Sequence, residues 1–190
     1  MKHANVRFTY DDYLLLPEDK RHEILDGEVY VVPAPNTKHQ TVGLNLKLAI
    51  CRPVKENGLG RVFDAPYDVV LSEDNVVQPD ILFVRKERLA IIGSANLQGA
   101  PDLVIEILSP GTRSRDLEVK RKIYARFGVQ EYWIVDPDAE TIEVLVWGED
   151  GYASAGGYGV SDRLASPLLP DLKLPLCKIF KNDLDTEEHG

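Results

Sequence analysis

The most informative segment of the chain is an apolar run with one charged residue near its centre. Residues 103–108 read Leu-Val-Ile-Glu-Ile-Leu, so the carboxylate of Glu106 stands among aliphatic side chains. A short run of this kind predicts a strand that is buried on both faces. An isolated ionised carboxylate is costly in such a place unless a cation or several hydrogen-bond donors meet it. The sequence therefore predicts a compensating partner opposite Glu106.

A second carboxylate interrupts another apolar segment. Residues 76–84 predict one strand that contains Asp80, and alternation places Asp80 on the same face as Gln78. The alternative is that Pro79 and Asp80 form a turn in which Asp80 acts as a cap. For Glu106 the alternative is a buried ion pair with an arginine.

The segment that follows the Glu106 strand predicts a helix over 114–127, capped by Ser114 and ended by Gly128. Apolar residues recur at helical spacing after Asp116, and Lys120 falls on the same face as they do. We therefore expect Lys120 to face the sheet and Lys122 to face solvent. The alternative is an ordinary surface ion pair between Asp116 and Lys120.

The other segments predict the rest of the fold. A strand, a helix and a further strand in the order 103–108, 114–127 and 131–135 predict a βαβ unit, hence a mixed sheet with helices on its faces. We expect one domain over 1–182 and an acidic, mobile tail over 183–190. The remaining predicted elements are a short helix at 13–16 behind a capping box at Thr9, a hairpin of 22–25 and 28–32 around Asp26-Gly27, a helix from the capping box Thr37–Gln40 to Asn57-Gly58, strands at 60–64, 67–71 and 141–147, a loop-rich segment at 148–159 and an extended covering strand at 168–176.

Composition narrows the class of protein. The chain has 190 residues, of which 44% are hydrophobic and 28% charged, as in a globular protein with one core. The net charge of −9 counts against a nucleic-acid partner, although a bound divalent ion would reverse the sign locally. The two cysteines, Cys51 and Cys177, form no zinc or disulfide pattern. Without a signal peptide or a long apolar run, the sequence predicts a soluble, cytoplasmic protein with no membrane partner.

Two carboxylates on adjacent strands and a lysine facing them suit one chemistry. Hard oxygen ligands hold Mg²⁺ or Mn²⁺ through few contacts and leave water ligands for a substrate phosphate. Such an ion polarises a phosphoryl group, and a nearby ammonium can orient water or stabilise an anionic transition state. Asp80, Glu106 and Lys120 are the residues that the sequence offers for these roles.

The chain resembles the Uma-type restriction endonuclease family, a branch of the PD-(D/E)XK nuclease superfamily, over residues 8–180. The resemblance implies an α/β restriction-endonuclease-like core with a mixed central sheet flanked by helices in the order αβββαβ, an N-terminal hairpin and extra C-terminal strands. The matching segments are His22-Glu23 with Asp26-Gly27-Glu28, Pro35 with His39-Gln40, Gln78-Pro79-Asp80, the block from Pro101 to Pro137 that includes Asp116, Lys120 and Tyr124, and residues 169–175.

The resemblance also implies an activity, namely hydrolysis of DNA with Mg²⁺ or Mn²⁺ bound by Asp80 and Glu106, by an enzyme that acts as a homodimer. The superfamily pattern has a lysine two places after the second acid, where this chain has Leu108. Lys120 from the following helix is the expected replacement, and Glu23 is expected as an auxiliary acid.

Four further residues are candidates for the surroundings of the site: His39, Gln78, Asp116 and Tyr124. For His39 a role in the helix-start turn is an equal alternative, and Tyr124 is expected chiefly in core packing.

Two other functions of the protein stay open. A nuclease fold without turnover, acting as a binding or regulatory module, is favoured by the missing lysine and the acidic charge. A sugar hydrolase with Asp80 and Glu106 as acid and base is the weaker alternative.

Overall fold

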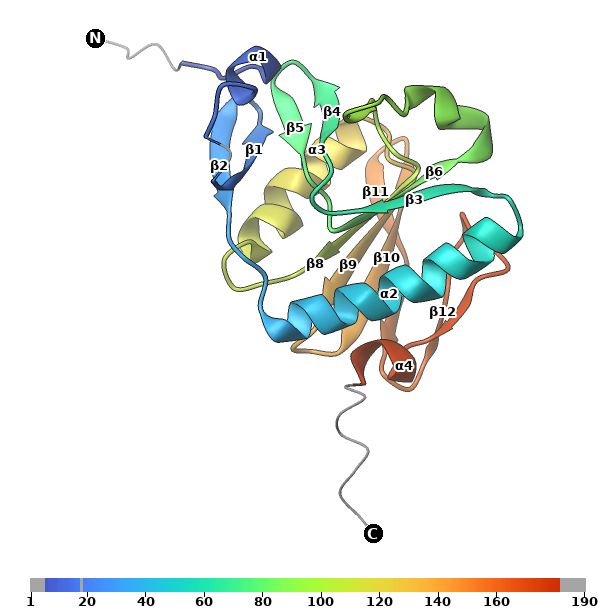
Figure 1. Ribbon diagram of the computed structural model, residues 1–190. Helices are drawn as coiled ribbons and strands as arrows, with labels where there is room; N and C mark the ends of the chain where they lie inside the picture. Colours follow the sequence, from blue (N-terminus) through green and yellow to red (C-terminus); the bar gives the residue numbers. More distant parts are fainter. Residues whose placement is uncertain (1–5, 18, 182–190) are drawn as a thin grey trace.

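A six-stranded mixed sheet forms the centre of the fold (Figure 1). The computed structural model describes residues 6–17 and 19–181, so the tail expected at 183–190 lies outside the described residues. Within the sheet, the central pair β8–β9 is parallel and the other neighbours are antiparallel. The strand order is β11 (Gly151–Gly159), β10 (Thr141–Gly148), β9 (Glu131–Asp136), β8 (Leu103–Ile107), β6 (Ile81–Arg85) and β3 (Gly60–Asp64).

A second, five-stranded sheet contains the predicted hairpin. The hairpin strands pair in antiparallel register, and the turn residues Asp26 and Gly27 have φ angles of 51° and 81°, which confirms the Asp-Gly turn. The order in this sheet is β2 (Glu28–Val32), β1 (Arg21–Leu25), β5 (Asn75–Val77), β4 (Val69–Ser72) and β7 (Leu97–Gln98). A third, two-stranded sheet pairs β12 (Arg163–Ala165) with β13 (Lys173–Pro175).

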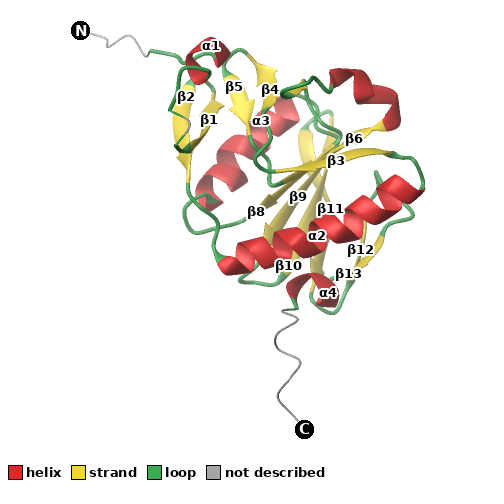
Figure 2. Ribbon diagram, viewed as in Figure 1, coloured by secondary structure: helices red, strands yellow, loops and turns green. Residues whose placement is uncertain are grey.

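Helices cover the two faces of the central sheet (Figure 2). The long helix α2 (Thr37–Glu56) packs its predicted apolar stripe against Leu103, Ile105 and Ile107. The helix α3 (Arg121–Arg126) packs on the opposite face, the one that carries Val104. The prediction that β8 is buried on both faces is therefore confirmed. The short helices are α1 (Tyr10–Tyr13), α4 (Cys177–Phe180) and the 3₁₀ segment η1 (Lys86–Ile91).

The predicted unbroken strand over 76–84 is wrong. β5 ends at Val77 and β6 starts at Ile81, so Asp80 lies at a bend immediately before β6. Pro79 explains the break, because it has no N–H to give to a strand ladder. The two short strands belong to different sheets, and the residues between them carry the chain from one sheet to the other.

The predicted helix over 114–127 exists with a different start. Its first part is the π-helical segment η2 (Arg115–Lys120), which continues directly into α3. Ser114 is in helical conformation and makes no capping hydrogen bond, so the predicted cap is wrong. The predicted stop is confirmed, since Phe127 is the C-cap residue and Gly128 has a φ of 71°.

Four smaller expectations also need correction. The N-cap of α2 is Asn36 rather than Thr37, because the Asn36 side chain accepts from the His39 N–H. The capping box at Thr9 is confirmed, but its helix starts at once, at Tyr10. The segment predicted as loop at 148–159 contains β11, whose Gly- and Ala-rich sequence has no apolar period and is held by pairing with β10. Of the covering segment at 168–176, only β13 is a strand.

Among the described residues, no helix combines the length and the apolar character needed to cross a membrane.

Candidate active site

Glu106 lies on the face of β8 that is covered by the η2–α3 helix, and only 3% of its surface is exposed. Its Oε1 accepts two hydrogen bonds, from Lys120 Nζ at 3.0 Å and from the Tyr124 hydroxyl at 2.5 Å. The compensating cation opposite Glu106 is thus a lysine, and the arginine alternative is wrong. Tyr124 does pack in the core, as expected, but its hydroxyl also contacts the candidate site.

Lys120 is the centre of a buried charge cluster. Its Nζ lies 2.8 Å from Glu23 Oε1, 3.0 Å from Glu106 Oε1 and 3.6 Å from Asp116 Oδ1. The side chain is 5% exposed, so the prediction that Lys120 faces the sheet is confirmed and the surface-pair alternative is wrong. Lys122 is exposed, as expected. The helix turn that presents both Asp116 and Lys120 to the sheet is the π-helical one.

Glu23 joins the cluster from the other sheet. It sits on β1, and its Oε1 accepts from the backbone N–H of Gln78 at 2.9 Å as well as facing Lys120. Its Oε2 lies 3.9 Å from Arg115 Nη1. Both oxygens of Glu23 therefore face cations, and the residue couples the five-stranded sheet to the helix that carries Lys120.

Asp80 and His39 form the second part of the site. Asp80 Oδ2 accepts from the Ile107 N–H at 2.8 Å and lies 3.2 Å from His39 Nε2. His39 takes part in the helix-start turn, because its backbone N–H donates to the Asn36 side chain, and its ring also lies in the cavity against Asp80. The bend at Asp80 directs this carboxylate to Ile107 at the end of β8, the residue after Glu106, and both carboxylates line the same cavity.

One small cavity collects the residues that sequence reasoning singled out. Its volume is about 30 Å³, close to that of one or two waters. Its wall carries more carboxylates than lysine and arginine side chains. The candidate residues that line it are Glu23, His39, Gln78, Asp80, Glu106, Asp116 and Lys120, whereas Tyr124 lies behind Glu106.

The electrostatics of the cavity favour an added positive charge. Burial raises the pKa of the Glu106 carboxyl well above its ordinary value, and the nearby Lys120 ammonium offsets this only in part. Burial likewise raises the pKa of Asp116. For Lys120, burial alone would lower the pKa, but Glu106, Glu23 and Asp116 together raise it well above its ordinary value. A further cation in the cavity would therefore favour the ionised forms of Glu106 and Asp116.

The donor set fits a hard divalent cation with few protein ligands. Within residues 6–17 and 19–181, no three His, Cys, Asp or Glu side chains are grouped as a complete metal cage. Mg²⁺ needs only one or two carboxylates, because it keeps several of its waters. Asp80 and Glu106 could supply these, and Asp116 Oδ1 is buried and accepts no hydrogen bond from the described residues.

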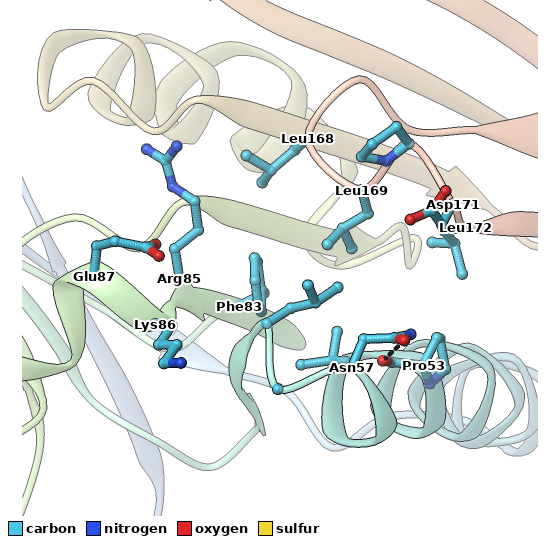
Figure 3. A pocket seen from close by; sticks show the side chains of 14 residues that line it. Pro53, Asn57, Phe83, Arg85, Lys86, Glu87, Leu168, Leu169, Asp171 and Leu172 are labelled. Carbon is cyan, nitrogen blue, oxygen red and sulfur yellow. Dashed lines mark hydrogen bonds between the residues drawn. The ribbon is translucent and has the colours of Figure 1, made fainter.

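A larger cavity lies elsewhere and lacks this chemistry. It has a volume of about 250 Å³ and is bounded by the C-terminal end of α2, the end of β6 and the loop before β13 (Figure 3). Its wall is mostly apolar, with Phe83, Leu169 and Leu172, and the Nε of Arg85 at its edge donates to Asp102. We therefore place the candidate active site in the small carboxylate-lined cavity.

Sequence reasoning missed two arginines at the site. Arg21 lines the cavity, and strand alternation in β1 could have found it, since it lies two residues before Glu23 on the same face. Arg115 reaches Glu23 while its guanidinium stacks 4.5 Å over the Tyr30 ring. Its position depends on the π-helical turn, for which the sequence holds no signal.

The mixed sheet between two helices, with an acidic cavity where the Glu106 strand meets the helix that follows it, defines a protein of the restriction-endonuclease-like fold. The chain belongs to the Uma2 family, described as "Putative restriction endonuclease", whose model matches residues 10–177. The resemblance noted from the sequence is thus confirmed.

Two relatives illustrate the likeness. An uncharacterized protein of Synechocystis sp. is 26% identical over 158 residues, which are 81% of this chain and 82% of that protein. A crystal structure from Anabaena variabilis, described as a "putative nuclease belonging to DUF820", superposes with a TM-score of 0.77 at 24% identity. That match covers 91% of this chain and 97% of the other, and it supports the fold assignment.

Proposed function

We propose that the protein is a Mg²⁺- or Mn²⁺-dependent endonuclease that hydrolyses phosphodiester bonds of DNA in the carboxylate-lined cavity. Membership of a restriction endonuclease family supports nuclease activity in general. The observation that carries the specific proposal is that Asp80, Glu106 and Lys120, from three separate elements, line one cavity.

Asp80 and Glu106 would hold the ion, which supplies polarisation of the phosphoryl group and a more acidic bound water. The backbone N–H of Ile107 and the ring of His39 fix the Asp80 carboxylate. Lys120 and Tyr124 both bond the same oxygen of Glu106, Oε1, so its other oxygen is the one left for a ligand.

Lys120 serves in place of the lysine that the superfamily pattern has at the position of Leu108. An ammonium has three N–H donors, and here two of them are directed to Glu23 and Glu106. The third is not taken by Asp116, whose Oδ1 at 3.6 Å lies beyond hydrogen-bond distance. It would serve the attacking water or an oxygen of the phosphate, where it would stabilise the negative charge of the transition state. Glu23 serves as the acid that holds Lys120 in position. Two such sites in a homodimer would face the two strands of a duplex.

A plasmid-nicking assay tests the proposal. The wild type should convert supercoiled plasmid to open-circle or linear product with Mg²⁺ or Mn²⁺ and stop on addition of a chelator. Asp80→Asn and Glu106→Gln should lose cleavage by a factor of about 10² or more, while Lys122→Met on the outer face of the same helix should cleave as the wild type does. Undiminished cleavage by Asp80→Asn would remove that residue from the site.

A nuclease fold that binds without turnover is the second candidate, favoured by Leu108 at the usual lysine position and by the net charge of −9. Calorimetric titration with Mn²⁺ separates the two functions. Binding of the ion to the wild type without any plasmid cleavage would favour the binding module. Plasmid cleavage that survives the chelator would contradict both the metal-dependent nuclease and the binding module.

A further inference from the structure

Arg21 is a cation at the junction of two cavities. Its side chain lines the small cavity of the candidate active site and also a neighbouring cavity of about 150 Å³ that extends along α2. His39, Asp80 and Ile107 border both cavities as well. A molecule that occupies both cavities would therefore lie against both Arg21 and Asp80.

The Arg21 guanidinium is held in place by a neutral acceptor. Its Nε donates to Gln78 Oε1 at 2.8 Å. The amide nitrogen of Gln78 donates in turn to Asp68 Oδ1 at 2.7 Å and to the Tyr13 hydroxyl at 3.1 Å. Gln78 therefore fixes the orientation of Arg21 without neutralising it, which leaves the terminal N–H groups and the full charge for a ligand.

The other cations of the two cavities are already paired. Lys120 is surrounded by three carboxylates, and Lys47 Nζ lies 2.6 Å from Asp64. Arg21, in contrast, has no carboxylate within 4.0 Å among the residues that the structure describes. A polyanionic substrate that approaches this acidic chain needs a local positive charge at the cavity mouth, and Arg21 is placed to provide it.

We propose that Arg21 binds a phosphate of the nucleic-acid backbone adjacent to the phosphate that is cleaved, and that Gln78 is its positioning residue. This inference rests on the proposed function and adds to it a substrate contact outside the reacting centre. The planar guanidinium offers two parallel N–H donors to phosphate oxygens, a geometry that lysine cannot reproduce.

Binding of a fluorescent DNA duplex, measured by anisotropy with chelator present over a series of salt concentrations, tests the inference. Loss of one phosphate contact should lower the slope of log K against log salt by about 0.9, which corresponds to a loss of about eightfold in affinity at 0.1 M salt. We expect this for Arg21→Gln. Arg21→Lys should keep the slope but bind more weakly than the wild type, because it loses the fork and the bond to Gln78.

The matched control is Arg52→Ala, since Arg52 is 79% exposed on α2, paired with Glu56, and lines neither cavity. Its slope and affinity should equal those of the wild type. Equal binding by Arg21→Gln and wild type, equal losses in Arg21→Gln and Arg52→Ala, or no binding of the duplex by the wild type would each overturn the inference. If Arg21→Gln does not fold, the weaker binding expected of Arg21→Lys decides the matter.

The outcome is separable from that of the proposed function, because binding is measured without metal and without turnover. A wild type that binds through Arg21 and never cleaves plasmid would refute the nuclease proposal alone. A wild type that cleaves, with unchanged binding in Arg21→Gln, would refute only the role of Arg21.

Discussion

Replacement of Lys120 by methionine should destabilise the fold far more than replacement of a surface lysine. The change removes one positive charge and leaves Glu23, Glu106 and Asp116 buried around an apolar group of similar length. All four side chains are at most 5% exposed, so bulk water cannot take over the role of the ammonium.

The magnitude follows from the burial of the cluster. Removal of one partner of a buried ion pair costs about 3–5 kcal/mol, because a desolvated charge loses its compensation. Replacement of an exposed lysine such as Lys122 changes the stability by about 0.5 kcal/mol or less. With a urea m-value of about 2 kcal/mol/M, the unfolding midpoint of Lys120→Met should fall by about 2 M.

Urea unfolding followed by circular dichroism gives this number, with Lys122→Met on the same helix as the matched control. The double variant Lys120→Met with Glu106→Gln should cost less than the sum of its two single changes, because one of the uncompensated charges leaves with the lysine. Midpoints of Lys120→Met and Lys122→Met within experimental error of each other would refute the inference that the cluster depends on Lys120.

Three further predictions concern single groups. Tyr124→Phe removes only the hydroxyl that donates to Glu106, and should cost about 1.5–3 kcal/mol in urea unfolding; an unchanged midpoint would argue against that bond. Burial raises the pKa of Glu131, so the folded pKa exceeds the unfolded one and the wild type should lose stability as pH rises through the folded value. The Glu131→Gln variant should lack this loss, and parallel pH profiles of the two proteins would contradict it. Gly27→Ala, at a φ of 81°, should lower the stability by about 1 kcal/mol or more in thermal unfolding. Gly157→Ala, where a Cβ meets open space, should cost less, and the reverse order would contradict the inference that the turn at Gly27 fixes the hairpin.

The sequence predicts those parts of the fold that depend on local patterning. The apolar run around Glu106 has the length and composition of a strand buried on both faces, and the structure confirms it. Helical spacing after Asp116 is enough to separate Lys120 from Lys122, because the apolar stripe of the helix must face the sheet. The cost of a buried carboxylate then predicts that a cation meets Glu106.

The parts that could not be predicted depend on contacts distant in sequence or on locally irregular backbone. The pairing of Glu23 with Lys120 joins two different sheets, and no local pattern encodes it. The π-helical turn at η2 has no sequence signal, although it decides where Arg115 and Asp116 point. For Asp80, the strand prediction relied on the apolar residues that follow it. Pro79 indicated the break between β5 and β6 correctly.

The proposed activity depends most on Asp80 and Glu106 sharing one divalent cation. A crystal soaked in Mn²⁺ and measured at a wavelength with anomalous manganese signal tests this directly. We predict one anomalous peak in the carboxylate-lined cavity, at about 2.0–2.3 Å from an oxygen of each of the two side chains. A peak bound elsewhere, or an empty cavity in crystals of a protein that cleaves DNA with Mn²⁺, would contradict the account.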